Sequence, residues 1–197
     1  MPGFNIHLAV GKRYLEKIKL DKRDDVRDER AFCEGILAPD LVENKKITHY
    51  TGNTNTNDLE KYLEDKVRLT LFLKENKVDT DFEKGVFLHL LTDRLFFTEF
   101  FDKEYINNIN YDDFVNCLYY SYESTNEYLY KKYDIDLSVY GDRLIKNIEK
   151  NKKEKKIENS PEQIKKRKQI FTVEELDKFI EKISDIDLKE EVKKYKE

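Results

Sequence analysis

The segment that most constrains this chain is residues 85–97, Gly-Val-Phe-Leu-His-Leu-Leu-Thr-Asp-Arg-Leu-Phe-Phe. Successive residues of a helix are about 100° apart, so the apolar side chains of this segment cover every side of the helix. A helix of this kind is stable only when other helices pack around it. We therefore predict that a helix over residues 80–101 lies at the centre of the molecule.

Besides Arg94, this segment contains two ionisable side chains, His89 and Asp93. Their i,i+4 spacing places both on one face of the helix. A buried imidazole or carboxylate without a partner costs several kcal/mol, and a metal ion would satisfy both groups at once. His and Asp are common ligands of zinc and iron. The same spacing also suits a hydrogen bond within a helical core, so both interpretations remain open.

The other two histidines of the chain also have unusual surroundings. His7 shares the inward face of the first helix with Val10 and Tyr14. His49 follows Asp40 after a short polar segment, and the proline before Asp40 fixes the backbone so that the carboxylate projects from a helix end. We predict that all three histidines converge with Asp40 and Asp93 on one site.

Helical periodicity dominates the rest of the chain, and strand-like alternation is nearly absent. We expect further helices over residues 5–19, 24–37, 57–74, 111–133 and 138–150, and from residue 172 onward. Capping-box patterns open three of the helices: Asn57 with Glu60, Thr80 with Glu83, and Thr172 with Glu175. The expected fold is all-α, a multi-helix bundle around a central buried helix with a helical C-terminal tail.

Composition supports a helical protein, because 40% of the 197 residues are charged, 13% are aromatic, and only six are Gly and three Pro. This length suits one domain with an appendage. We divide the chain into a helical metal-binding domain (1–148), a charged linker or helix extension (149–170) and a helical tail (171–197). The basic stretch within residues 146–168 is expected to be solvated. A strip that binds phosphate or an acidic membrane surface is the alternative.

Charge and cysteine content narrow the class of protein further. The net charge of −4 does not require a nucleic-acid partner. Cys33 and Cys117 fall in apolar helical stripes, so we expect core residues rather than a disulfide or a cysteine metal site. No apolar run approaches the roughly 18 residues of a transmembrane helix, and the N-terminus lacks the pattern of a signal peptide. We therefore expect a cytoplasmic protein without a transmembrane segment.

Four segments, in this order, resemble the zinc-dependent phospholipase C family, whose wider superfamily includes single-strand-specific nucleases. They are Asn5-Ile-His7 with Gly11, Gly35-Ile-Leu-Ala-Pro-Asp40, Thr48-His-Tyr50, and Gly85-Val-Phe-Leu-His-Leu-Leu-Thr-Asp93. The resemblance covers about residues 3–130, and the last segment is the most specific. It implies an all-helical domain with a cluster of divalent metals that hydrolyses a phosphodiester or a phospholipid head group.

The resemblance also implies roles for single residues. Asp40, His49, His89 and Asp93 would hold one metal, and His7 would join Asp93 at a second. Zinc is the expected metal, with manganese or iron as alternatives. Asp40 would also act as a general base that orients a metal-activated water.

The chain departs from the family pattern after Asp93. Where the family has a histidine six residues later, this chain has Glu99, which remains a candidate ligand because a carboxylate suits a harder metal. Where the next long helix of the family carries a His-x-x-x-Glu pair, this chain has no histidine. Its Glu123 and Glu127 are expected to face solvent or a polar cleft. Three functions stay open: a metal-dependent phosphoesterase, a scaffold or interaction module with a structural metal, and a helical bundle whose histidines are ordinary core residues.

Overall fold

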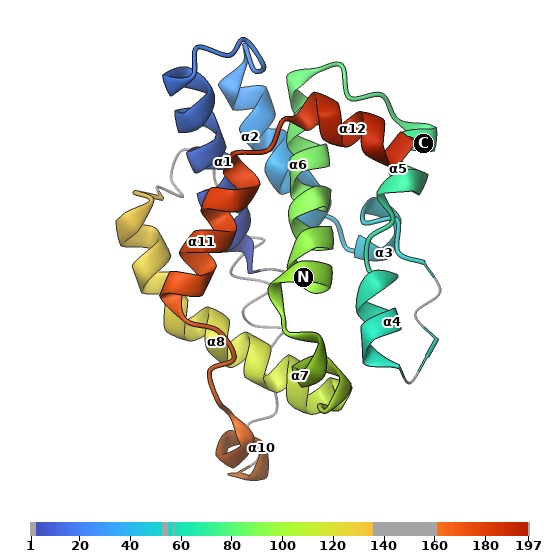
Figure 1. The fold of residues 1–197 in the computed structure, drawn as a ribbon, viewed down its shortest axis with the longest axis vertical. Helices are drawn as coiled ribbons and strands as arrows, with labels where there is room; N and C mark the ends of the chain where they lie inside the picture. The colour runs from blue at the N-terminus through green and yellow to red at the C-terminus, as the bar shows by residue number, and fades with distance from the viewer. Residues whose placement is uncertain (1–2, 53–54, 57, 136–160, 197) are drawn as a thin grey trace.

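The computed structural model describes residues 3–52, 55–56, 58–135 and 161–196. Within these ranges every regular element is helical and no strand occurs, which confirms the all-α class (Figure 1). The elements in chain order are α1 (Phe4–Leu20), α2 (Glu29–Leu37), the 3-10 turn η1 (Ala38–Asp40), α3 (Lys45–Thr48), α4 (Leu59–Glu64), α5 (Leu69–Glu75), α6 (Asp81–Leu95), the π-helical turn η2 (Phe96–Phe100), α7 (Lys103–Asn107), α8 (Tyr111–Lys132), α10 (Pro161–Lys166), α11 (Val173–Ser184) and α12 (Leu188–Lys196).

Helix α6 is buried on all of its sides along its central turns. It opens with the predicted capping box, in which the Glu83 N–H donates to the Thr80 hydroxyl and the Thr80 N–H donates to the Glu83 carboxylate. Every residue from 87 to 93 is buried, polar residues included. Helices α1, α2 and α5 contact α6, so His89 and Asp93 lie in the interior of the protein.

Helices α2 and α6 approach each other closely at two glycines. A Cβ atom at Gly35 would lie 2.1 Å from the carbonyl oxygen of Phe82, and a Cβ atom at Gly85 would lie 2.1 Å from the carbonyl oxygen of Phe32. Because real Cβ atoms do not come this close to backbone oxygen, only glycine allows this crossing. The two helix backbones therefore touch one turn before His89.

Two predicted helices start later in the structure. Helix α2 starts after Asp28, whose side chain accepts a hydrogen bond from the Ala31 N–H. Helix α4 starts after Asp58, whose side chain accepts one from the Lys61 N–H, and Asn57 lies outside the described residues. In both cases an aspartate captures the first free backbone N–H groups, and the helix begins there.

The single helix predicted over residues 57–74 is wrong, because the structure has α4 and α5 with a non-helical segment between them. The carbonyl groups of this segment bind other parts of the chain. The Gly52 N–H donates to the Asp65 carbonyl at 2.7 Å, and the Thr51 hydroxyl donates to the Lys66 carbonyl at 3.0 Å. These long-range hydrogen bonds replace those of a continuous helix.

The predicted helices over residues 5–19 and 111–133 are confirmed as α1 and α8. The predicted inward stripe of α8 is buried and consists of Phe114, Cys117, Leu118, Tyr122 and Leu129. Glu123 and Glu127 are exposed to solvent. The helix predicted over residues 138–150 and most of the charged linker lie outside the described residues.

The C-terminal helices pack onto the N-terminal part of the chain. Helix α11 lies beside α1 (Figure 1) and α12 contacts α5. Leu176, Ile180 and Ile183 of α11 are fully buried in the common core. At the edge of this contact, the Arg13 guanidinium pairs with the Glu181 carboxylate at 2.7 Å. The first and the last helix thus share one hydrophobic core.

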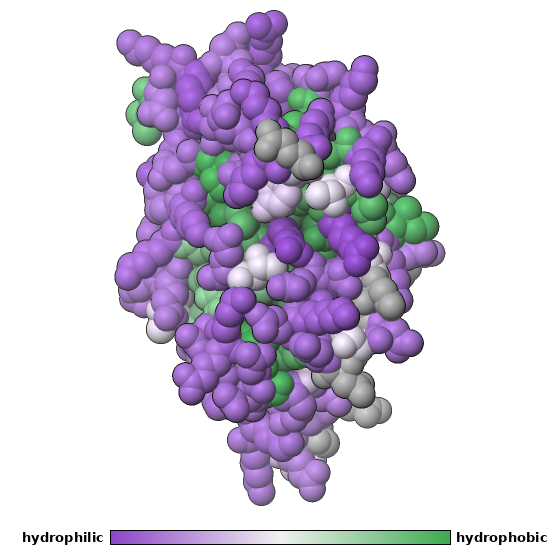
Figure 2. Space-filling view, turned by 45° about the vertical axis from the view of Figure 1, so that its right-hand side comes forward, coloured by the Kyte–Doolittle hydropathy of each residue, from purple (hydrophilic) through white to green (hydrophobic). Residues whose placement is uncertain are grey.

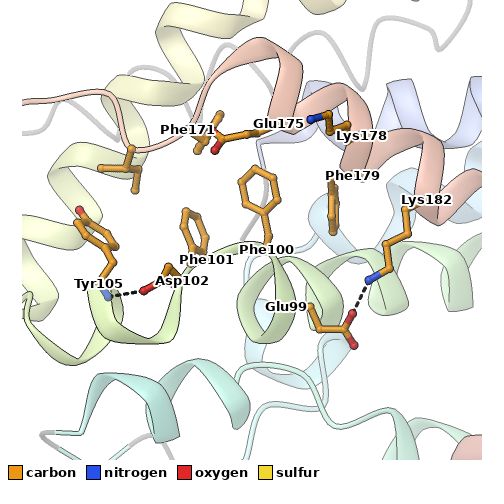
Figure 3. Close-up of a pocket in the computed structure, with 11 residues that line it drawn as sticks. Glu99, Phe100, Phe101, Asp102, Tyr105, Phe171, Glu175, Lys178, Phe179 and Lys182 are labelled. Carbon is orange, nitrogen blue, oxygen red and sulfur yellow. Dashed lines mark hydrogen bonds and ion pairs between the residues drawn. The ribbon is translucent and has the colours of Figure 1, made fainter.

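Hydrophilic side chains cover most of the surface in view in Figure 2, and hydrophobic side chains show mainly in the recesses between them. None of the helices in the described ranges has an apolar stretch that would cross a membrane. At the end of α6 the π-helical turn η2 directs Glu99 and Phe100 toward α11, where Glu99 pairs with Lys182 (Figure 3).

Candidate metal centre

Five of the six candidate ligands meet in one buried cluster. It is formed by His7 on α1, Asp40 in η1, His49 directly after α3, and His89 and Asp93 on α6. Asp93 is 0% exposed, each histidine is 1% exposed, and Asp40 is the most exposed at 8%. Residues that are far apart in the sequence therefore present their polar groups to one small volume.

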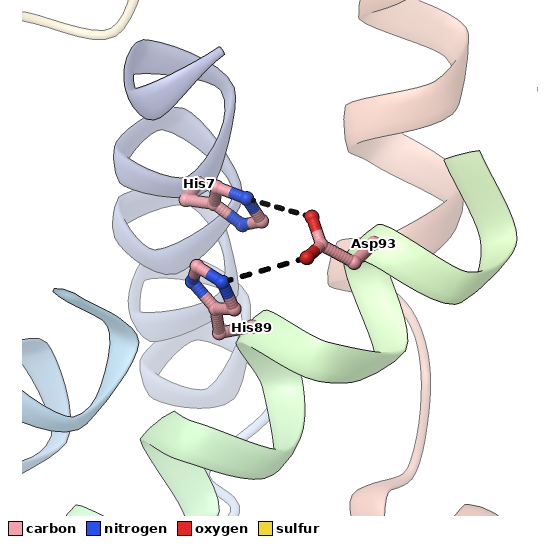
Figure 4. A group of neighbouring side chains, drawn as sticks. All are labelled: His7, His89 and Asp93. Atoms are coloured by element: carbon pink, nitrogen blue, oxygen red, sulfur yellow. Dashed lines mark ion pairs between the residues drawn. The ribbon is translucent and has the colours of Figure 1, made fainter. Parts of the chain in front are cut away.

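The carboxylate of Asp93 lies among the three imidazoles. Its Oδ1 atom is 3.1 Å from Nε2 of His7, and its Oδ2 atom is 3.2 Å from Nε2 of His49 and 3.6 Å from Nε2 of His89. The rings of His7 and His89 stack with their centroids 3.8 Å apart (Figure 4). Asp93 is thus the residue that touches all three histidines.

These close contacts lack the geometry of hydrogen bonds. Within the described residues, neither carboxylate oxygen of Asp93 and neither ring nitrogen of His7 has a hydrogen-bond partner. Buried polar atoms without hydrogen bonds cost several kcal/mol. A cation that binds the carboxylate oxygen and the ring nitrogens would remove this penalty, so the donor set fits a metal ion.

Backbone carbonyls orient the other two imidazoles. Nδ1 of His89 donates to the Ile36 carbonyl at 2.7 Å, and Nδ1 of His49 donates to the Lys45 carbonyl at 2.8 Å. A carbonyl oxygen can only accept, so Nδ1 of each ring is the donor in these hydrogen bonds. The two Nε2 atoms face each other at 3.1 Å. Metal-binding histidines commonly donate their second ring N–H to a carbonyl in this way.

Burial and neighbouring charges set the protonation states. Burial lowers the pKa of His89 to about 3, an effect to which His7 adds, so that this imidazole is neutral at pH 7. Burial by itself would raise the pKa of Asp93, but His7 and His89 outweigh it and lower the pKa well below its usual range. The Asp93 carboxylate is therefore ionised next to a neutral imidazole, as a metal site requires.

Asp40 closes the cluster on its more exposed side. Burial acts to raise its pKa, but His89 and Lys45 outweigh burial and lower the pKa to about 2. The Lys45 ammonium pairs with Oδ1 of Asp40 at 2.5 Å, and Nε2 of His49 is 3.8 Å from the same oxygen. Asp40 thus connects the imidazoles to a charged group that reaches solvent.

The donor atoms form two overlapping sets. One consists of His7, His89 and Asp93, and the other of Asp40, His49 and His89. Within each set the atoms lie within 4.8 Å of one another. Nitrogen and oxygen ligands of zinc lie about 2.0–2.2 Å from the ion, so atoms on opposite sides of one ion are up to about 4.4 Å apart. Each set is therefore close to the size that one divalent ion needs.

The structure does not bring Glu99 to this cluster. Its carboxylate is on the surface, where its side chain is 46% exposed and pairs with Nζ of Lys182 at 2.6 Å. The π-helical turn η2 follows the last residue of α6 and changes the direction in which later side chains point. The six-residue spacing from Asp93 therefore leads to the surface.

Sequence reasoning missed Lys45 and the two carbonyl groups that hold the imidazoles. The i,i+4 spacing of Lys45 and His49 was a usable signal, since it places the Lys45 carbonyl below the His49 ring once α3 forms. The Ile36 carbonyl has no signature in the sequence, because every residue has a carbonyl.

Comparison of the chain with models of protein families, with curated proteins and with solved structures found no match.

Proposed function

We propose that the buried cluster binds a divalent metal and that the protein is a metal-dependent hydrolase of phosphoesters. The observation that carries this proposal is the ionised carboxylate of Asp93, which three imidazoles surround without hydrogen-bond geometry. Imidazole nitrogen together with carboxylate oxygen suits zinc best, with manganese or iron as alternatives.

The chain supplies the ligands and a base. His7, His89 and Asp93, or Asp40, His49 and His89, would hold the metal, which when bound supplies Lewis acidity toward a phosphoryl oxygen and toward water. Asp40 is ionised and is the most exposed residue of the cluster. Its carboxylate can accept a proton from an attacking water. Lys45 beside it supplies positive charge on the side from which an anionic substrate would approach.

The substrate class rests on the resemblance of four segments to the zinc-dependent phospholipase C family. It is a phosphodiester or a phospholipid head group. This assignment agrees with the chemistry of the ligand set, because a metal with a nearby carboxylate base is a common arrangement for hydrolysis at phosphorus.

The burial of the cluster favours a second candidate function, a scaffold or interaction module with a structural metal. Structural zinc sites are closed, whereas catalytic sites keep one coordination position open. No residue of the cluster is more than 8% exposed. In this case the metal only stabilises the crossing of α1, α2 and α6.

Two measurements test these functions. Elemental analysis of the purified protein, before chelation and after addition of zinc or manganese, reports whether the cluster binds metal. A protein that takes up no metal contradicts both functions. Hydrolysis of a chromogenic phosphodiester by the metal-loaded protein then separates them.

Matched variants assign the activity to the cluster. We expect His89→Ala to lose both metal and turnover. Asp40→Asn should lose turnover, and its metal content is measured in the same sample. Lys74→Met, at an exposed residue of α5, should change neither. Stoichiometric metal without turnover in the wild type would identify the metal as structural.

A further inference from the structure

A pocket of about 430 Å³ lies between the end of α6, α7 and α11 (Figure 3). Its floor is aromatic, with the ring centroid of Phe100 at 5.1 Å from Phe101, 5.4 Å from Phe171 and 5.2 Å from Phe179. The volume falls within the range of about 300–1,000 Å³ that is typical of small-ligand sites. The lining residues in the described part of the chain include no member of the metal cluster, so this is a separate candidate site.

The carboxylates around the pocket all have partners. Glu99 pairs with Lys182 at 2.6 Å, Asp102 accepts a hydrogen bond from the Tyr105 N–H at 3.0 Å, and Glu175 accepts one from the Thr172 N–H at 2.7 Å. The negative charges at the rim therefore serve an ion pair and two helix caps, and they are not oriented toward a ligand cation.

Lys178 is the exception among the charged groups at the rim. It is exposed on α11, one turn before Lys182, and has no hydrogen bond or ion pair within the described ranges. Figure 3 shows Lys178 and Lys182 near the Phe179 end of a row of rings that continues through Phe100. The pocket thus combines an apolar floor with an ammonium group that has no partner among the residues that the structure describes.

We propose that this pocket binds a small amphipathic anion. The apolar body of the ligand lies on the phenylalanine rings, and its carboxylate or phosphate pairs with Lys178. Removal of apolar surface from water supplies most of the affinity, and the ammonium selects the sign of the ligand charge. The π-helical turn η2, which presents Phe100 to the pocket, is of a kind that often occurs at functional sites. This site does not depend on metal binding by the cluster.

Four ligands with the same chain test the proposal: dodecanoate, dodecyl phosphate, dodecanol and dodecylammonium. Their binding to the full-length protein is measured by calorimetry, below the critical micelle concentrations of the three charged ligands and below the solubility limit of dodecanol. We expect dodecanoate or dodecyl phosphate to bind more tightly than dodecanol, and dodecylammonium to bind most weakly. The two anions show whether the site prefers carboxylate or phosphate. Dodecylammonium binding as tightly as the anions, or no binding of any anion up to its solubility limit, would overturn the proposal.

Three variants locate the binding. Lys178→Met should weaken binding of the anions by about threefold, the size expected for an exposed ion pair, and leave dodecanol unchanged. Phe100→Ala should weaken all ligands by about tenfold through lost apolar contact. The control Lys74→Met, at an exposed lysine that does not line the pocket, should change nothing. If Lys178→Met and Lys74→Met, both folded by circular dichroism, bind dodecanoate equally well, Lys178 does not hold the anion and the proposal fails.

Discussion

His89 belongs to both sets of donor atoms in the cluster, and its second ring nitrogen is held by the Ile36 carbonyl. Its neutral imidazole lies next to the ionised Asp93, so we expect the proposed metal binding to depend most on this residue. Asp81 acts at the other end of α6, where its carboxylate binds two backbone N–H groups that precede α2. His89 therefore bears on the response to a chelator, and Asp81 on the pH dependence of stability.

We predict that a chelator lowers the melting temperature by several degrees and that zinc or manganese restores it. A metal that binds only the folded state stabilises it by about 2.7 kcal/mol at a hundredfold excess over its Kd. His89→Ala should abolish the response, whereas Lys74→Met should keep it. Differential scanning calorimetry measures both. An identical melting curve with and without chelator, for protein shown to contain metal beforehand, contradicts the prediction.

Asp81→Asn should make the protein less stable at pH 7 but not at low pH. Burial acts to raise the pKa of Asp81, and its bonds to Lys84 and to the backbone outweigh burial and lower the pKa below that of the unfolded chain. A depressed pKa adds stability that is present above the unfolded pKa of about 3.9 and is lost as the pH falls through the folded pKa.

Urea unfolding at several pH values tests this expectation. At pH 7 the free energy of unfolding of the variant should be about 1–2 kcal/mol lower than that of the wild type. This difference should become smaller as the pH falls below about 4, because Asp81 of the wild type is then protonated. A loss that stays constant down to the lowest pH at which the protein folds would show that the charge of Asp81 is unimportant.

At the scale of elements, the crossing of α2 and α6 decides the geometry of the cluster. The two backbones meet at Gly35 and Gly85, and the same contact brings the Ile36 carbonyl to Nδ1 of His89. A wider crossing would separate this donor from its acceptor and leave the imidazole free to rotate. Helix packing therefore sets the orientation of the His89 imidazole in the candidate metal centre.

Gly85→Ala should destabilise the protein by about 2–3 kcal/mol, because the new Cβ atom would overlap the Phe32 carbonyl oxygen of a rigid helix. Gly11→Ala is the matched control. Its Cβ atom would lie 2.3 Å from Cδ1 of Ile36, the end of a side chain that can rotate away. We expect a smaller loss there, measured by urea unfolding. If the two variants lose the same free energy of unfolding, the backbone contact at Gly85 is no more rigid than the side-chain contact at Gly11.

At the scale of the whole molecule, α11 connects the end of the chain to its beginning. Ile180 is 0% exposed within the common core, and ion pairs from Arg13 and Lys17 to Glu181 surround the contact with α1. Side chains of α11 also contact η2: the ring centroids of Phe179 and Phe96 are 5.5 Å apart. The C-terminal residues are thus part of the structure that holds the cluster in place.

Ile180→Ala should lower the free energy of unfolding of the whole protein by about 2–4 kcal/mol in a single transition. The control Ile186→Ala, at a residue only partly buried against the core, should have a smaller effect. Chemical unfolding followed by circular dichroism and by tyrosine fluorescence measures this. Two separate transitions in either variant would show that the C-terminal helices fold independently of the rest.

The all-α class and the elements with strong local signals follow from the amino-acid sequence alone. Capping boxes at Thr80 and Thr172 marked the starts of α6 and α11, and the apolar segment around His89 marked a helix buried on all sides. It also indicated the five ionisable residues of the cluster: His89 and Asp93 by their apolar surroundings, and His7, Asp40 and His49 together with the resemblance of the four segments. The capping boxes and the pair of His89 and Asp93 depend on residues three or four positions apart.

The break between α4 and α5, the position of Glu99 and the orientation of the imidazoles could not be predicted from the sequence. Each depends on contacts between distant residues, such as the Gly52 N–H on the Asp65 carbonyl and Nδ1 of His89 on the Ile36 carbonyl. Backbone donors and acceptors are the same in every residue, so the side-chain pattern does not show which of them pair. The packing of the helices selects those pairs, and with them the geometry of the candidate metal centre.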